Sequence, residues 1–280
     1  MRVYISADIE GVTGLVSWSQ CGRPDGNHFD YRWARERMTA DVNAAIRGAV
    51  DAGATSVVVK DSHGNSKNLI LSDLDPIAEL VSGHGSGTDG MMMGIDDTFD
   101  CALLIGYHAM AGTLHGIMEH TISGRVHRSW INGMPAGEIA FSAGVAGQYG
   151  VPVVAVSSDA AGCAEAAALI PDVSTATVKF GFGRYMGRCL PASETEKVIR
   201  LAAADGVHRA KQIKPWTPES PVTFRIEFNR TEEADMAAKL VRSLRIDAYT
   251  VEFRSDSYEE AHRAAWNIIT LGGVGAHSDE

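Results

Sequence analysis

The sequence is poor in cysteine, in net positive charge and in long apolar runs. Only four cysteines occur among its 280 residues. None forms a C-x-x-C pair, so neither a disulfide framework nor a thiolate zinc site is predicted. No apolar run approaches the ~18 residues of a membrane span, and the segment MRVYISADIE lacks the apolar core of a signal peptide. We therefore expect a soluble cytoplasmic protein that does not enter a membrane.

The balance of charge limits the partners. The formal net charge is −10, and binding to nucleic acid or to an anionic membrane requires clustered lysine and arginine to neutralise phosphates. Neither is therefore expected as a partner, and small or cationic ligands fit better.

Apolar, β-branched runs alternate with helix-like stretches along much of the chain. They cover residues 3–7, 31–52, 56–59, 102–105, 151–156 and 161–169. The longest, YRWARERMTADVNAAIRGAVDAG, has apolar residues at helical spacing and ends at Gly53. This alternation predicts βαβ units, and hence an α/β fold with a mainly parallel sheet covered by helices on both faces.

Two segments depart from the alternation. In SWINGMPAGEIA, the pair Asn132-Gly133 lies between apolar residues and predicts an antiparallel hairpin insertion. After the proline-containing KPWTPESP, strand-like and helix-like stretches indicate a smaller C-terminal α+β unit. We expect the main α/β domain over residues 1–213, the smaller domain over residues 214–272 and a disordered tail over residues 273–280.

Side chains that can bind metal ions follow three of the predicted strands. Asp8 and Glu10 close the first run two residues apart, so strand alternation places both on one face. Asp61 and His63 follow the second run, and His108 follows the third. Ligands of open α/β sheets bind outside the carboxyl ends of the strands. We therefore expect these side chains to meet at one edge of the sheet.

The mixture of donors indicates the kind of metal. With Glu138 after the hairpin, the set contains three carboxylates and two imidazoles: Asp8, Glu10, His63, His108 and Glu138. Carboxylate with imidazole suits zinc, manganese or iron rather than calcium, which prefers oxygen ligands alone. The set is too large for one tetrahedral catalytic ion with an open position, and it suits two ions that share one carboxylate.

The segment AMAGTLHGIMEHTISGRVHRSW is unusually rich in histidine. It contains His115, His120 and His127. One of these imidazoles could act as a general acid or base beside the metals, and spacing alone does not choose among them.

Six motifs, in the same order, resemble the M55 family of metallopeptidases. They are S-A-D-I-E-G at residues 6–11, K-D-S-H at 60–63, G-I-D-D-T-F at 94–99, G-Y-H-A at 106–109, M-E-H at 118–120 and N-G-M-P-A-G-E at 132–138. The resemblance extends over nearly the whole chain. It implies a three-layer α/β/α fold and a dinuclear zinc aminopeptidase, of the D-aminopeptidase type found with bacterial dipeptide-transport operons. The implied substrates are short peptides with a free N-terminus, or amino-acid amides, with D-amino-acid peptides among them.

The resemblance also implies a role for each metal-binding residue. Asp8 would bridge two zinc ions per subunit, with manganese or cobalt as alternatives. Glu10 and His63 would complete the coordination of one ion. His108 and Glu138 would complete that of the other.

The same resemblance assigns the catalytic histidine and the assembly. His120, in M-E-H, corresponds to the family's catalytic histidine, with His115 as the alternative. A homo-oligomeric ring of ten subunits is implied as well. Asp61 and Asp159 could receive the α-ammonium group of a substrate. We favour structural roles for them, with Asp61 orienting His63 and Asp159 capping the following helix.

Two other functions are compatible with the same residues. A dinuclear phosphoesterase or nuclease of the D-x-E type shares the opening motif, but Gly11 stands where such exonucleases usually have threonine, and the net charge disfavours nucleic acid. A non-catalytic binding module stabilised by metal is the second alternative, although structural metal sites are closed by protein ligands.

Overall fold

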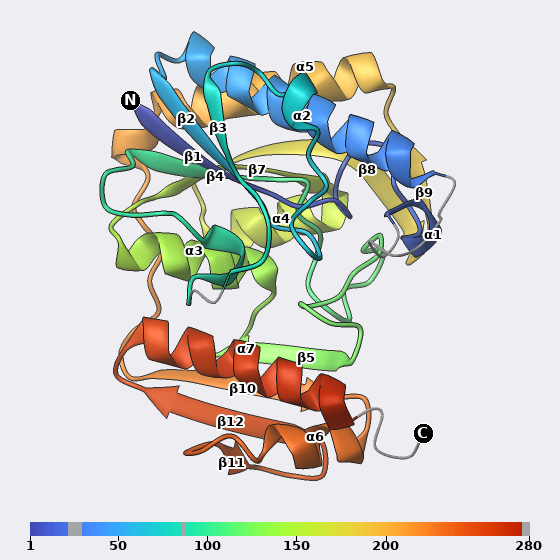
Figure 1. The fold of residues 1–280 in the computed structure, drawn as a ribbon, viewed down its shortest axis with the longest axis vertical. Coiled ribbons are helices and arrows are strands. Elements are labelled where there is room, and N and C mark those ends of the chain that lie inside the picture. The colour runs from blue at the N-terminus through green and yellow to red at the C-terminus, as the bar shows by residue number, and fades with distance from the viewer. Residues whose placement is uncertain (22–29, 86–87, 276–280) are drawn as a thin grey trace.

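The computed structural model describes residues 1–21, 30–85 and 88–275. They contain two sheets, which lie at opposite ends of the long axis of the molecule (Figure 1). The larger sheet has seven strands in the order β3-β2-β1-β4-β7-β8-β9. Its neighbours are parallel except for β8 and β9, which are antiparallel. In chain order these strands are β1 (Arg2–Ala7), β2 (Ser56–Asp61), β3 (Ala78–Val81), β4 (Cys101–Ile105), β7 (Val153–Asp159), β8 (Ser174–Gly183) and β9 (Met186–Cys189).

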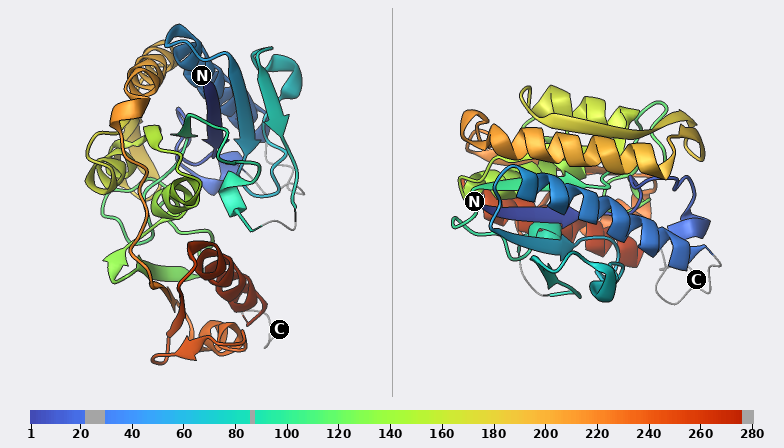
Figure 2. Two further views of the ribbon diagram at one scale, coloured as in Figure 1. Left: turned by 90° about the vertical axis from the view of Figure 1, so that its left-hand side faces the viewer. Right: turned by 90° about the horizontal axis from the view of Figure 1, so that it is seen from above.

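Helices cover both faces of the larger sheet (Figure 2). The helices α2 (Tyr31–Asp51) and α5 (Ala192–His208) pack against each other on one face, while α3 (Glu138–Gln148) and α4 (Ala160–Leu169) lie on the other. The short α1 (Trp18–Cys21) lies beside α2, and single 3₁₀ turns span Leu71–Asp73, Gly90–Met92 and Ala210–Gln212. The predicted three-layer α/β/α arrangement is confirmed.

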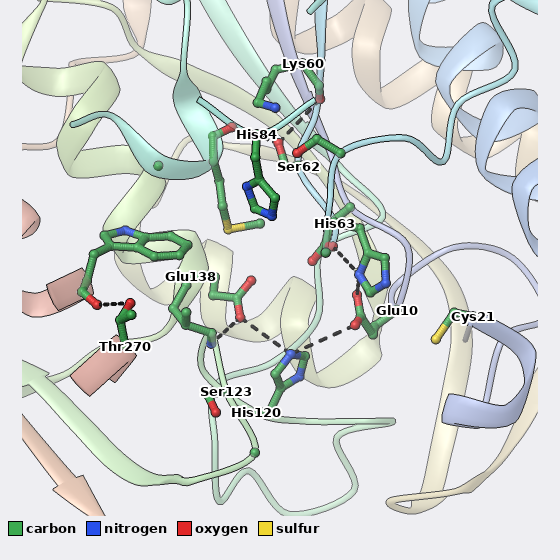
Figure 3. Close-up of a pocket in the computed structure, with 18 of the residues that line it drawn as sticks. Glu10, Cys21, Lys60, Ser62, His63, His84, His120, Ser123, Glu138 and Thr270 are labelled. Atoms are coloured by element: carbon green, nitrogen blue, oxygen red, sulfur yellow. Dashed lines mark hydrogen bonds and ion pairs between the residues drawn. The ribbon is translucent and has the colours of Figure 1, made fainter. Parts of the chain in front are cut away.

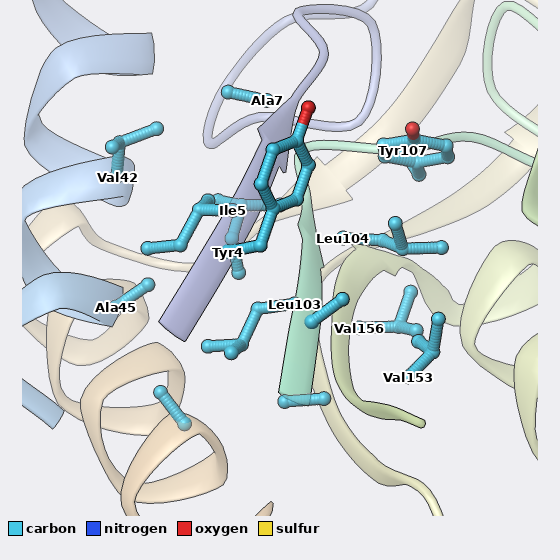
Figure 4. Close-up of a cluster of buried hydrophobic side chains, with 14 of the residues drawn as sticks. Tyr4, Ile5, Ala7, Val42, Ala45, Leu103, Leu104, Tyr107, Val153 and Val156 are labelled. Atoms are coloured by element: carbon cyan, nitrogen blue, oxygen red, sulfur yellow. The ribbon is translucent and has the colours of Figure 1, made fainter. Parts of the chain in front are cut away.

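The main core explains why the central strands are apolar along their whole length. Ile5 of β1 and Leu103 of β4 are paired in register and point towards Val42 of α2, whereas Leu104 lies on the opposite side of the sheet (Figure 4). All of these side chains are buried. A strand buried on both faces has no side exposed to solvent, so polar residues do not alternate with apolar ones along it. This is expected for a parallel sheet covered by helices on both faces.

The second sheet is antiparallel and has five strands in the order β11-β12-β10-β5-β6. They are β5 (Val126–Ile131), β6 (Met134–Pro135), β10 (Val222–Phe228), β11 (Leu244–Arg245) and β12 (Thr250–Ser255). The helices α6 (Thr231–Ala237) and α7 (Tyr258–Gly275) pack on this sheet. In β10 the buried residues alternate with more exposed ones, because only one face is covered.

The predicted hairpin is confirmed, and it contributes to the second sheet. Asn132 and Gly133 both have positive φ, at 51° and 82°, as a two-residue hairpin turn requires. The hairpin strand β5 pairs antiparallel with β10. The smaller sheet therefore combines a segment from the middle of the chain with the C-terminal strands.

The end of the chain differs from the expected disordered tail. Residues 273–275 continue α7, where Gly272 and Gly275 pack closely against Phe228 and the backbone of Glu232. The rest of that predicted tail, residues 276–280, lies outside the described residues. Within the described part of the chain, no helix is both long and apolar enough to cross a membrane.

Candidate metal centre

The candidate ligands gather where three neighbouring strands end. The strands β2, β1 and β4 are adjacent and parallel, so their carboxyl ends reach the same edge of the sheet. Asp8 and Glu10 follow β1, His63 follows β2 and His108 follows β4. The structure brings these residues together at the predicted edge of the sheet. Glu138, from α3, and His120, from the loop after β4, lie beside them.

The route by which Asp8 and Glu10 reach this edge differs from strand alternation. The strand β1 ends at Ala7, and only the Asp8 N–H continues the ladder, donating to the Ile105 carbonyl at 2.8 Å. The chain then turns, with the Val12 N–H donating to the Ile9 carbonyl at 3.2 Å. The prediction that strand alternation places Asp8 and Glu10 on one face is therefore wrong. A turn after β1 directs the two carboxylates to the edge of the sheet.

Two glycines allow this turn to pack against the segment after β4. A Cβ atom on Gly11 would lie 1.7 Å from the Tyr107 carbonyl oxygen, and one on Gly106 would lie 2.3 Å from the Asp8 carbonyl oxygen. The Gly11 N–H donates to the Gly106 carbonyl at 2.7 Å. Glycine is thus needed at position 11 because any side chain there would prevent the close approach of the two backbones.

The carboxylate of Asp8 lies between two histidines. Its Oδ1 is 3.5 Å from Nδ1 of His63, and its Oδ2 is 3.5 Å from Nε2 of His108. His63 Nδ1 is also 3.0 Å from Oε2 of Glu10, while His108 Nε2 is 3.3 Å from Oε2 of Glu138. The donors therefore form two pairs, each of one imidazole and one carboxylate, with Asp8 facing both.

The chemistry of this cluster fits metal ions. Asp8, Glu10, Glu138 and His108 are each at most 3% exposed. Asp8 Oδ2 and His108 Nε2 are buried and have no hydrogen-bond partner among the described residues. Buried polar atoms are normally satisfied, and an unsatisfied pair facing each other across 3.5 Å suits a cation between them.

The pKa values of the carboxyl groups reflect the same crowding. Burial, together with the neighbouring Glu10, raises the pKa of Asp8 to about 7. Burial also acts to raise the pKa of Glu10, but His63 and His120 outweigh it and hold that pKa well below its usual range. Without added positive charge, the two acids cannot both ionise freely.

Backbone carbonyls orient two of the imidazoles. His108 Nδ1 lies 3.0 Å from the Ala109 carbonyl, and His120 Nδ1 lies 2.9 Å from the Met118 carbonyl. An Nδ1–H that donates to these carbonyls leaves Nε2 with its lone pair facing the cluster. The two rings stack with centroids 4.0 Å apart, and Trp18 packs edge-on against His120 at 4.9 Å.

His120 is the histidine of the H-rich segment that faces the cluster. Its Nε2 lies 3.7 Å from Glu138 Oε1 and 3.9 Å from Glu10 Oε1 (Figure 3). Burial and the nearby His108 lower the pKa of His120 to about 4. His115 and His127 are exposed, and neither lines the cavity beside the metal cluster.

The two aspartates with expected structural roles hold loops that carry ligands. Asp159 accepts the Gly162 N–H at 2.8 Å, so the predicted helix cap is confirmed, and it also accepts the Ile117 N–H at 2.6 Å. Asp61 accepts the backbone and side-chain N–H groups of Asn68, and Asn68 Nδ2 in turn donates to the His63 carbonyl at 2.8 Å. Within the described part of the chain, no hydrogen bond joins Asp61 to the His63 ring, so Asp61 acts through Asn68 and does not orient the imidazole directly.

Sequence reasoning missed Cys21. Its thiol lies close enough to Glu10 and His63 for the three to share a metal ion. Burial raises the pKa of this thiol well above its usual range, and the carboxylates of Glu10 and Asp8 add to the effect. A single cysteine carries no spacing signal, so only the fold could reveal its position.

A cavity of about 1240 Å³ opens beside the cluster. One wall comes from the edge of the larger sheet, including Lys60, Ser62 and His63 (Figure 3). The opposite wall comes from α7, through residues such as Trp266 and Thr270. The second unit therefore shapes the site although the ligands belong to the first.

A buried lysine holds the loop that presents Glu10. Lys179 on β8 is fully buried, and its Nζ donates to the carbonyls of Glu10, Val12 and Leu15 at 2.6, 3.0 and 2.5 Å. Burial lowers its pKa to about 8. The ammonium group has three N–H donors, and each has one backbone acceptor.

Replacing Lys179 with methionine should loosen this loop. Three buried carbonyls would lose their donor, so we expect the free energy of unfolding to fall by at least about 2 kcal/mol and zinc affinity to fall about 10- to 100-fold. Urea denaturation and competition with a chromophoric chelator measure the two effects. Lys197→Met, at an exposed position of α5, is the control, and unchanged zinc affinity in Lys179→Met would contradict the proposed support.

Comparisons with known proteins identify the family of this chain. A sequence model of the M55 peptidase family, described as D-aminopeptidase, matches residues 1–266. A D-aminopeptidase of Bacillus subtilis strain 168 is 35% identical over 270 residues, covering 94% of this chain and 95% of that protein. Among solved structures, the Zn-dependent D-aminopeptidase DppA from Bacillus subtilis, a self-compartmentalizing protease, matches with a TM-score of 0.92 and 34% identity over 98% of both chains. The chain therefore belongs to the M55 family of peptidases.

Proposed function

We propose that the protein is an aminopeptidase that binds two zinc ions and removes the N-terminal residue from short peptides or amino-acid amides, D-amino-acid peptides among them. The observation that carries the proposal is the Asp8 carboxylate, which faces one imidazole–carboxylate pair with each oxygen. Similarity to D-aminopeptidases, one of them Zn-dependent, supports both the metal and the substrate class.

Each pair would hold one ion. Glu10 and His63 would bind the first, His108 and Glu138 the second, and Asp8 would bridge the two. Two such ions, when bound, lower the pKa of a water molecule and polarise the scissile carbonyl. Asp8 Oδ2 and His108 Nε2, which have no hydrogen-bond partner among the described residues, support the binding of the second ion by His108 and Asp8.

His120 is proposed as the residue that moves the proton. Its Nε2 lies 3.7 Å or more from the Glu10 and Glu138 oxygens, too far for a hydrogen bond. With a pKa lowered to about 4, the imidazole is neutral at pH 7 and can accept a proton. It takes this proton from the attacking water as the C–O bond forms, and it gives it to the leaving amine as the C–N bond breaks.

The substrate class is tested by metal content and by a small substrate panel. The zinc-loaded protein should hydrolyse D-Ala-D-Ala and D-alanine amide and should lose this activity on chelation. It should recover activity with zinc, manganese or cobalt. L-Ala-L-Ala and a β-amino-acid amide report stereochemistry and backbone preference. Hydrolysis of a nitrophenyl phosphate ester without any peptidase activity would favour a phosphoesterase, and unfolding on chelation without any hydrolysis would favour a structural metal site.

Measuring turnover and zinc content together distinguishes a catalytic role of His120 from a role as a metal ligand. His120→Ala should reduce kcat about 100-fold or more, the range typical of a lost general acid or base, while zinc content stays near two ions per subunit. His115→Ala, at an exposed position outside the cavity, is the matched control and should keep nearly full activity. Loss of one zinc ion in His120→Ala, measured by metal analysis, would mean that His120 is a ligand.

The assembly is proposed to be a homo-oligomer, with a ring of ten subunits as the specific form. A self-compartmentalizing relative supports assembly, and so does an exposed apolar patch on the protein. The side chains of Leu114, Phe182, Tyr185 and Met186 are all more than half exposed, and the loop of Leu114 lies against the β8–β9 hairpin. Monomers rarely leave such a group of large apolar side chains in water.

Light scattering coupled to size exclusion measures the assembly directly. We expect the mass of ten subunits of 29.9 kDa, and we expect Phe182→Asp combined with Met186→Asp to produce smaller species. Leu201→Asp, on the exposed side of α5, serves as the control. A monomer at micromolar concentration would contradict the proposed assembly.

A further inference from the structure

The cavity contains a buried cation that the proposed reaction does not use. Lys60 lies on β2, three residues before His63, and its side chain lines the cavity. The residue is only 4% exposed. Its Nζ donates to the Asp61 carbonyl at 2.7 Å and, weakly, to the Gly83 carbonyl at 3.4 Å. One of the three N–H donors of the ammonium group is therefore left for a ligand.

Lys60 differs from Arg184 and Arg263 of the cavity in having no ion-pair partner among the described residues, although the Asp61 carboxylate acts on it from a greater distance. Arg184 lies 3.4 Å from Glu119, and Arg263 lies 3.8 Å from Glu259. Within the described residues, no carboxylate oxygen lies within ion-pair distance of Lys60. A cation removed from water without a counter-charge is costly, and this cost falls when an anion binds beside it.

We propose that Lys60 binds the C-terminal carboxylate of a short peptide substrate. This inference rests on the proposed aminopeptidase function and names the second end of its substrate. The carboxylate would accept an N–H from Nζ and would supply the ion-pair partner that Lys60 lacks. The contact is a charge-assisted hydrogen bond in a sheltered site, which is among the stronger polar interactions in proteins.

The position of Lys60 in the cavity sets the direction of the peptide. Lys60 and His84 lie at one end, away from His120 and the carboxylates Glu10 and Glu138 (Figure 3). A peptide carries an ammonium group at its N-terminus and a carboxylate at its C-terminus. Lys60 attracts the carboxylate and repels the ammonium group, and an aminopeptidase acts on the N-terminal residue at its metals. The N-terminal residue is therefore held at the metals and the leaving residue points to Lys60.

The position of Lys60 also selects for length. A terminal carboxylate beside Lys60 requires a peptide that ends inside the cavity, one wall of which comes from α7. A longer peptide would have to place an uncharged peptide group beside the ammonium. The lysine therefore favours di- or tripeptides over longer chains, in agreement with the substrate class proposed above.

The test compares a peptide with and without its terminal charge. In the zinc-loaded wild-type protein, kcat/KM should be at least about tenfold higher for D-Ala-D-Ala than for D-alanyl-D-alanine amide, mainly through KM, as one charge-assisted hydrogen bond predicts. Lys60→Met should abolish this preference and leave hydrolysis of D-alanine amide within about twofold of wild type, since that substrate does not extend to Lys60. Lys60→Arg, which keeps the charge, should retain much of the preference.

Lys67→Met is the matched control, because it removes the same charge from an exposed position of the following loop. It should behave as the wild-type protein. Lys60 could also bind a carboxylate from an acidic side chain of the substrate. Comparing kcat/KM for D-Ala-D-Asp amide with that for D-Ala-D-Asn amide measures this preference. A preference confined to the aspartate peptide would overturn the assignment to the C-terminal carboxylate.

Failure of this inference is distinguishable from failure of the proposed function. Equal rates for D-Ala-D-Ala and its amide in the wild-type protein, or an unchanged preference in folded Lys60→Met, would overturn the role of Lys60 while leaving an active aminopeptidase. If Lys60→Met does not fold, the wild-type comparison and Lys60→Arg still decide. If no substrate is hydrolysed, calorimetric titration of the same two peptides into wild type measures the charge preference without turnover, and equal affinities would overturn it.

Discussion

Three carboxylates share one buried site, and the rest of the structure depends on how their charge is balanced. Asp8, Glu10 and Glu138 are almost inaccessible to solvent, and like charges in such a site repel strongly. His63 and His108 each lie between two of these carboxylates, which offsets part of the repulsion. The remaining unsatisfied atoms are those that metal ions would contact, so metal binding would also stabilise the fold.

The acids are held mainly through their backbone, which leaves their side chains available. Lys179 donates to the Glu10 carbonyl and not to its carboxylate. The Gly11 and Gly106 segments lie in direct backbone contact, which helps to fix the turn without using the Glu10 carboxylate, while Asp8 Oδ1 accepts the Ile9 N–H at 2.9 Å. A lysine that bonded the Glu10 carboxylate instead would compete with the metal for the same lone pairs. The positive charge of Lys179 is thus placed where it supports the loop and does not occupy the site.

Helix α3 connects the metal cluster to the second unit. Glu138 is its first residue, at the end where the helix dipole favours negative charge, and its Oε1 accepts the Ile122 N–H at 2.6 Å. One turn later, Phe141 packs against Phe224 of the second sheet with ring centroids 5.1 Å apart. The Tyr258 hydroxyl of α7 donates to the Phe141 carbonyl at 2.8 Å. Movement of the second unit would therefore act on a ligand residue as well as on the cavity wall.

Local sequence patterns predicted β1, β2, β4 and β7 of the larger sheet, the hairpin turn and the grouping of the donors at one edge, because strand runs and their termini are local features. They did not predict β3, β8 or β9 of the same sheet. They did not predict that the hairpin strand β5 would pair with β10, since that pairing joins Ile131 to Phe224 across the intervening domain. For the same reason the α7 wall of the cavity could not be foreseen. Cys21 stands alone in sequence. Lys60 opens the K-D-S-H motif, but its burial at the cavity wall cannot be read from the motif. Motifs therefore identify the candidate metal ligands, whereas the α7 wall of the cavity and the thiol of Cys21 reach the site through long-range packing, which a single sequence does not display.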